Sequence, residues 1–162
     1  RAEEFEQAFR IARRAGLAAL PHAGELAGPE SVHAAVTALG ADRVGHGVRA
    51  ADDPAALALL ADARVAAEVC PSSNVALGVA DTAADVPLLA LMDAGVPIAL
   101  GDDDPLLFGS RLAAQYRIAR EVHGLDDAGL ARLALESVEA SRAPDSVKAR
   151  LRDGIVDWLA GT

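Results

Sequence analysis

Apolar residues along this chain follow two patterns, short continuous runs and recurrences at helical spacing. The runs predict four strands that are buried on both faces, at residues 17–22, 41–47, 63–70 and 94–100. Helical spacing predicts helices between and after them, at about 29–39, 52–61, 84–94 and 107–123. A further helix opens the chain, two or three helices fill residues 126–159, and residues 71–74 and 101–105 are expected to be loops.

Strands that alternate with helices at short, even intervals are typical of parallel βαβ units and predict an α/β fold. Polar residues at the strand ends favour a barrel over an open sheet, because the C-terminal strand ends of a (β/α)8 barrel carry its chemistry. His22, His46, Cys70 and Asp103 lie at or just beyond the four strand ends. His46 follows His22 by 24 positions and Cys70 follows His46 by 24, about the length of one barrel repeat. The pattern therefore predicts a (β/α)8 TIM barrel.

Four strands are only half of the number that such a barrel requires. The opening helix also starts without a capping residue or an initiator methionine. We therefore expect residues 1–162 to be the C-terminal half of a single barrel, lacking its N-terminal half. Half a barrel exposes two sheet edges, so self-association is also expected.

Composition excludes several classes of partner. Asp and Glu outnumber Lys and Arg by 24 to 15, giving a formal net charge of −9. Sequence-independent binding of nucleic acid requires an excess of basic side chains that neutralise phosphates. The single cysteine, Cys70, excludes an internal disulfide and fits a reducing compartment. The apolar runs are far shorter than the roughly 20 residues that cross a bilayer, and the opening does not resemble a signal peptide. We expect a cytoplasmic protein without a nucleic-acid or membrane partner.

Candidate chemistry gathers at the predicted strand ends. His22 is followed by two small residues and then by Glu25, a carboxylate within reach of anything that the histidine holds. His46 stands between two glycines, which allow close approach to a ligand and strained backbone angles. Asp102, Asp103 and Asp104 crowd three carboxylates together, which is unfavourable unless a cation or protons offset the repulsion. Imidazole with carboxylate suits zinc or a similar divalent ion, and therefore hydrolytic chemistry.

Other polar residues have simpler explanations. Asp52-Asp53-Pro54 repeats the pattern of Asp103-Asp104-Pro105 but follows a small polar link instead of an apolar strand, and is expected to cap a helix. Cys70 is expected to be a small buried hydrophobe. Ser72, Ser73 and Asn74 either line the mouth of the site or make the turn, and turn chemistry is favoured. His33 lies within a helix and His123 near a helix end, where a cation suits the dipole, and both are expected to be structural.

Four motifs occur in a fixed order: HAGE at 22–25, RVGHG at 43–47, CPSSN at 70–74 and DDPLLFG at 103–109. With these motifs the chain resembles the C-terminal half of the adenosine deaminase family. The resemblance implies a (β/α)8 barrel with one zinc ion, and an enzyme that deaminates adenosine or a related 6-aminopurine nucleoside to inosine or its analogue and ammonia. The family's other two zinc ligands come from a His-x-His segment near its N-terminus, which is not among these residues.

The resemblance also implies a role for individual side chains. His22 and Asp103 would be zinc ligands. Glu25 would protonate the purine ring nitrogen N1, and His46 would orient the attacking water and act as base or electrostatic partner. Asp104 would bind purine N7. Asp102 stands where the family usually has a small or neutral polar residue, so its own role is open.

Several alternatives remain open at this point. Adenine deaminases typically carry Asp where Gly45 stands here, so Gly45 favours a nucleoside as the substrate. Deaminases of AMP surround similar motifs with more basic residues than this acidic chain has. An aminofutalosine-type nucleoside is a further candidate. A different possibility is that the polypeptide is a non-catalytic half-barrel, inactive without its missing half.

Overall fold

The computed structural model describes residues 2–161, with side chains from Glu4 onward. The chain divides into two compact units. The first unit contains the residues up to Val69 together with Pro87–Pro97, and the second contains Cys70–Val86 and the residues from Ile98 onward. Each unit is described separately below.

A short parallel sheet forms the centre of the first unit. Its strands are β1 (His22–Ala23), β2 (Arg43–His46) and β3 (Ala66–Glu68), in that spatial order. His22 is paired with Gly45, and Gly45 with Glu68, so these residues form one row across the sheet. Parallel strands joined by helices confirm the α/β fold.

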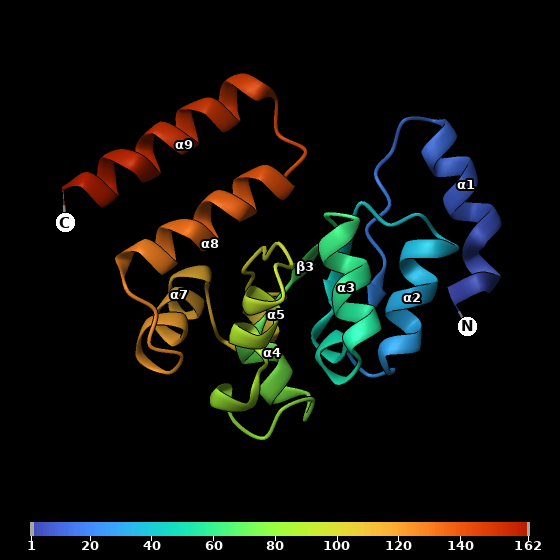
Figure 1. Ribbon diagram of the computed structural model, residues 1–162, viewed down its shortest axis with the longest axis horizontal. Helices are drawn as coiled ribbons and strands as arrows, with labels where there is room; N and C mark the ends of the chain where they lie inside the picture. Colours follow the sequence, from blue (N-terminus) through green and yellow to red (C-terminus); the bar gives the residue numbers. More distant parts are fainter. Residues whose placement is uncertain (1, 162) are drawn as a thin grey trace. The chain divides into compact units, whose positions relative to one another are not determined.

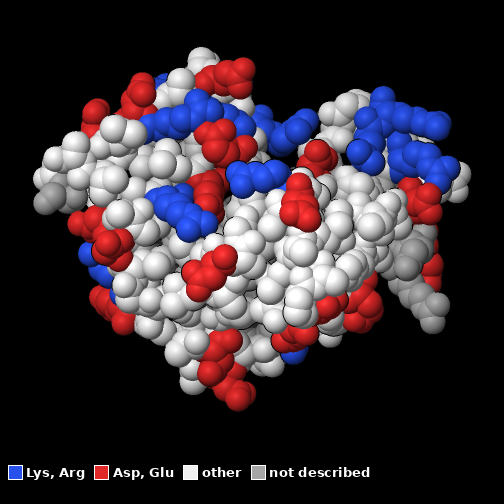
Figure 2. Space-filling view, viewed as in Figure 1, with Lys and Arg blue, Asp and Glu red and all other residues white. Residues whose placement is uncertain are grey.

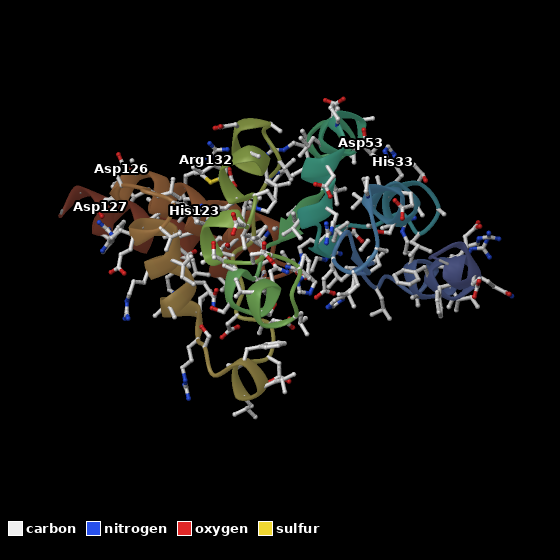
Figure 3. All side chains as sticks on the ribbon, turned by 90° about the horizontal axis from the view of Figure 1, so that it is seen from below. His33, Asp53, His123, Asp126, Asp127 and Arg132 are labelled. Atoms are coloured by element: carbon white, nitrogen blue, oxygen red, sulfur yellow. The ribbon has the colours of Figure 1, made fainter. Side chains whose placement is uncertain are left out.

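Helices surround this sheet (Figure 1). They are η1 (Ala2–Phe5), α1 (Glu6–Arg14), α2 (Pro29–Thr37), η2 (Val48–Asp52), α3 (Pro54–Asp62) and α5 (Leu88–Asp93). The side chains that they bury share small or branched apolar character: Val32, Ala35, Ala56, Leu60, Leu88 and Leu91. Burial of each larger one stabilises the unit by about 1.5–3 kcal/mol. His33 of α2 and Asp53 at the start of α3 point toward one another, 3.3 Å apart (Figure 3).

The second unit is helical. It contains α4 (Pro71–Ala76), η3 (Ala83–Asp85), α6 (Pro105–Phe108), α7 (Leu112–Glu121), α8 (Asp127–Ala140) and α9 (Asp145–Ala160). The helices α8 and α9 run side by side in opposite directions (Figure 1). Asp126 caps α8 by accepting the Gly129 N–H at 2.8 Å. Ala119 of α7 and Leu133 of α8 are among its fully buried apolar side chains.

The expected fourth strand is reduced to a single bridge residue, Ile98. The carbonyl of Pro97 accepts the Ala67 N–H at 2.9 Å, but proline has no N–H to continue a ladder. The N–H groups of Ile98 and Leu100 donate to side chains of α8 instead, to Glu136 at 2.8 Å and to Ser137 at 3.3 Å. The prediction of a regular strand at 94–100 was therefore wrong.

Three other local predictions were wrong as well. The segment 71–74, expected to be a loop, forms α4, because Pro71 suits a first helical position. The helix expected at 84–94 is interrupted by Pro87, which separates η3 from α5. The helix expected at 107–123 is split into α6 and α7 by Gly109, whose φ of +61° ends α6.

Charged side chains are spread over the surface seen in Figure 2, with basic side chains gathered over α1. Arg10, Arg13 and Arg14 of this helix line a cavity of about 370 Å³. In residues 2–161, no helix has the combined length and apolar character of a membrane span.

Candidate active site

Two of the predicted site residues meet at neighbouring strand ends of the first unit. Ala23 is paired with His46 across β1 and β2, which places His22 and His46 on adjacent strands. Their ring centroids lie 5.2 Å apart, with the planes tilted by 59°. His46 is only 3% exposed, whereas His22 is exposed. The structure therefore brings the two imidazoles together, one buried and one open to solvent.

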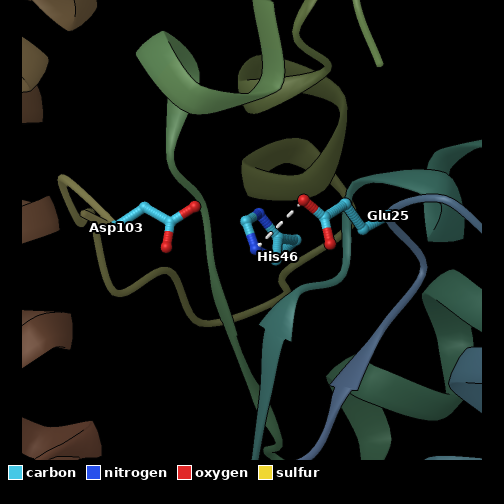
Figure 4. A group of neighbouring side chains, drawn as sticks. All are labelled: Glu25, His46 and Asp103. Carbon is cyan, nitrogen blue, oxygen red and sulfur yellow. Dashed lines mark ion pairs between the residues drawn. The ribbon is translucent and has the colours of Figure 1, made fainter. Parts of the chain in front are cut away.

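Glu25 adds a carboxylate to this pair. Its Oε1 lies 3.4 Å from Nε2 of His46, and its side chain is 14% exposed (Figure 4). The loop that carries Glu25 is held by hydrogen bonds from both flanks. Gly24 N–H donates to Ser31 Oγ at 2.8 Å, and Arg49 donates its N–H to the Gly24 carbonyl at 2.8 Å and its Nε–H to the Glu25 carbonyl at 3.3 Å. The contact brings a carboxylate and an imidazole together beside the ring of His22.

His46 and Asp103 have backbone angles that non-glycine residues seldom adopt. Their φ values are +62° and +58°. Such left-handed residues are strained, and they concentrate at functional sites where the surrounding structure holds them in place. Gly47 follows His46 with a φ of +70°, which confirms that a glycine beside His46 permits an unusual turn.

Gly45 leaves space for the ring of His22. A Cβ atom at position 45 would lie 2.9 Å from Nδ1 of that ring, closer than real Cβ contacts, and 3.0 Å from its Cγ, tighter than most. The missing side chain therefore accommodates the imidazole over β2. Any larger residue at this position would push the ring aside.

The predicted aspartates lie on a loop of the second unit. Asp103 and Asp104 are exposed, and Asp102 is half-buried. Asp104 caps α6, with one oxygen accepting the N–H groups of Leu106 at 3.1 Å and Leu107 at 3.0 Å.

Asp53 caps α3 in the same way, accepting the Ala55 N–H at 3.0 Å, as expected from the sequence. Both Asp-Asp-Pro segments are therefore helix caps, and capping alone does not distinguish the site candidate from the structural one. Capping engages only one of the two carboxylate oxygens of Asp104, which leaves the second as a possible ligand acceptor.

The donor groups suit a divalent cation. Imidazole nitrogen and carboxylate oxygen are ordinary zinc ligands, and a metal-binding imidazole needs a fixed orientation and access to solvent. The ring of His22 is open to solvent and occupies the space over Gly45. Asp103 offers an exposed carboxylate, and its backbone is in the left-handed region.

Most of the polar residues for which the sequence indicated a structural role have such a role in the structure. Cys70 is buried, and His33 pairs with Asp53 from within α2. His123 differs from expectation, because burial lowers the pKa of its ring and outweighs the opposing hydrogen bond with the Ala83 carbonyl. Its neutral form is therefore favoured, not the cation expected at a helix end. Sequence reasoning also missed Gln115, a fully buried amide of α7.

Comparison with known proteins identifies the family. The sequence matches the model of the adenosine deaminase family over residues 1–158. A Streptomyces coelicolor protein with the provisional name adenosine/adenine deaminase is 61% identical over 158 residues, which cover 98% of this chain and 46% of that protein. An aminodeoxyfutalosine deaminase of the same organism is 44% identical, over 97% of this chain and 42% of its own length.

Solved structures agree with this assignment. An adenine deaminase from Arthrobacter aurescens has a TM-score of 0.94 and 31% identity, covering 98% of this chain and 49% of that one. A zinc-bound amidohydrolase from Burkholderia ambifaria has a TM-score of 0.84 and 28% identity, covering 98% and 46%. The chain belongs to the adenosine deaminase family, and its α/β fold is that of part of a (β/α)8 barrel. It spans about half the length of the relatives that it matches.

Proposed function

We propose that this chain is the C-terminal half of a (β/α)8 barrel that hydrolytically deaminates adenosine or a related 6-aminopurine nucleoside. The observation that carries the proposal is the contact between Glu25 and the buried His46, beside the exposed ring of His22. This arrangement supplies an acid, a base and a possible metal ligand at adjacent strand ends. Membership of the deaminase family supports the reaction class.

The reaction exchanges an amino group for an oxygen at purine C6. A water oxygen forms the new bond to C6, the C6–N bond breaks, and ammonia leaves with the electron pair and the transferred protons. Glu25 would donate a proton to ring nitrogen N1 as the water adds. His46 would orient the attacking water and accept its proton. Positioned acids and bases of this kind each contribute about 10²- to 10⁴-fold to the rate.

His22 and Asp103 are the proposed ligands of a divalent ion, with zinc as the expected metal. Such an ion, when bound, lowers the pKa of water to about 7 and so makes hydroxide available at neutral pH. Asp104 would bind purine N7 through the carboxylate oxygen that does not cap α6. The zinc-bound relative supports this choice of metal.

Substrate choice follows from the space at Gly45 and from charge. Adenine deaminases typically have Asp at this position, where a Cβ atom would already contact the His22 ring here. The net charge of −9 disfavours a phosphorylated substrate such as AMP. The favoured substrates are therefore nucleosides without a phosphate group, adenosine first and an aminofutalosine-type nucleoside second.

The test is a comparison of kcat/KM for the protein in its natural, full-length form. Adenosine, adenine, AMP and an aminofutalosine-type nucleoside are assayed by ammonia release, before and after removal of metal with a chelator. We expect a nucleoside to be the best substrate, and metal removal to abolish turnover until zinc is restored. A strong preference for adenine would contradict the argument from Gly45, and turnover unaffected by metal removal would contradict the metal proposal.

A further inference from the structure

The CPSSN segment, residues 70–74, has no role in the chemistry proposed above, yet it contacts both ends of one loop. This aspartate loop, residues 101–110, carries Asp103 and Asp104. At its start, a Cβ atom on Gly101 would lie 3.1 Å from Sγ of Cys70. At its end, Ser110 Oγ lies 3.0 Å from Ser72 Oγ. One short segment therefore borders the loop at its entry and its exit, within the second unit.

Gln115 of α7 completes the contact at the loop's end. Its side chain is 0% exposed. Its Oε1 accepts the Ser72 N–H at 3.1 Å, and its Nε2 donates to Ser110 Oγ at 2.7 Å and to Ser72 Oγ at 2.9 Å. The amide oxygen of Gln115 is thus bonded to the backbone of α4, and its amide nitrogen is bonded to the hydroxyl groups of Ser72 and Ser110.

A buried amide makes this connection specific. Leaving a buried donor or acceptor without a partner is unfavourable, so Gln115 keeps its partners in place. The middle of the loop forms α6, which has only four residues, and its Leu106 is 94% exposed. Asp103 nevertheless holds a strained φ of +58°, which requires that the surrounding chain be fixed.

We propose that Gln115 and Ser72 position the aspartate loop through Ser110, and that this is the function of the CPSSN segment. The inference rests on the proposed function for one step only, the use of Asp103 and Asp104 as metal ligand and purine contact. Gln115 acts through the loop and is a positioning residue. Its loss should disturb the placement of both carboxylates without removing either one.

The experiment uses the full-length natural protein and measures amide hydrogen exchange of the aspartate loop, zinc affinity and deaminase kinetics. The variants are Gln115→Leu and Ser110→Ala, with Ser110→Thr as the conservative variant that keeps the hydroxyl. Ala119→Gly is the matched control, because it weakens the same helix at a fully buried position without a bond to the loop. Chelator competition gives the zinc affinity independently of turnover.

We expect faster exchange in the loop for Gln115→Leu and Ser110→Ala, together with zinc binding that is weaker by about tenfold or more, the scale of residues that orient metal ligands. Ser110→Thr should restore both, and Ala119→Gly should leave loop exchange at the wild-type level. Loop exchange in Gln115→Leu and Ser110→Ala equal to that of the control would overturn the inference. If wild-type protein neither binds zinc nor deaminates a purine, the proposed function fails, whereas the exchange measurement still decides whether Gln115 anchors the loop.

Discussion

Gly45 shows how a single missing side chain shapes the site. His22, Gly45 and Glu68 occupy one row across the sheet, and the space beside Gly45 is taken by the ring of His22. The position was singled out from the sequence for substrate choice. The structure adds a mechanical reason, because any side chain there moves a proposed metal ligand.

Gly45→Ala should weaken zinc binding without unfolding the protein. The added methyl contacts an exposed ring that can swing away, so the strain is relieved by displacing His22 rather than the backbone. We expect zinc affinity to fall by on the order of 10- to 100-fold, as for other residues that orient metal ligands. Chelator competition measures the affinity. Gly154→Ala is the control, since a Cβ atom there meets open space, and unchanged zinc affinity in Gly45→Ala would refute the argument.

The site was predictable where chemistry and chain position coincide. Histidines at successive strand ends must lie close together in a parallel sheet, and His22 and His46 do. The role of Gln115 was not predictable, because the sequence around a helical glutamine does not indicate its hydrogen-bond partners. These partners are 43 and 5 positions away in the chain. The left-handed angles of His46 and Asp103 were also outside what residue type alone reveals.

The helices and strands depart from expectation where proline or glycine intervenes. Strand order and parallel direction followed from the alternation of apolar runs and helical segments. The lengths of the helices and strands did not follow from this alternation. Pro97 stops the fourth strand, Pro87 interrupts one helix and Gly109 splits another. Apolar patterning predicts which segments are buried, whereas the available backbone N–H groups determine how far a ladder extends.

The end of α7 should make stability depend on pH through His123. Burial holds the pKa of this ring below its ordinary value of 6.5, so the unfolded chain binds the proton more readily than the folded one. The contribution to stability is therefore present above about pH 6.5 and lost as pH falls through the folded pKa. Urea unfolding of wild type and His123→Gln between about pH 7.5 and about pH 5.5 measures it.

We expect the wild-type protein to lose more stability over this range than His123→Gln, which stays neutral. Arg117→Gln, a change on the exposed face of α7, should keep the wild-type pH dependence. Identical pH dependence in wild type and His123→Gln would show that the ring's burial has no energetic effect.

The whole chain covers only part of the proteins that it resembles. The alignment with the Arthrobacter structure covers 98% of this chain, including both of its units, but only 49% of that structure. Two of the zinc ligands expected for the family lie outside the motifs present here. The 162-residue polypeptide by itself is thus proposed to be a half-barrel with an incomplete metal site.

Expressed alone, this polypeptide should contain little zinc and show little deaminase activity. The physical reason is that a catalytic zinc ordinarily requires three protein ligands, and only His22 and Asp103 are proposed here. Metal analysis and an adenosine assay on the purified 162-residue chain provide the test. A full equivalent of zinc together with turnover would contradict the half-barrel proposal.

The central claim is that Glu25, in contact with His46, is the proton donor of a purine deaminase. The most direct test is kcat/KM for the best nucleoside in Glu25→Gln, set against Glu30→Gln, which removes the same charge from an exposed position of α2. The account predicts a loss of about a hundredfold or more in Glu25→Gln, with zinc content unchanged, and near wild-type activity in Glu30→Gln. Wild-type kcat/KM in Glu25→Gln would contradict it.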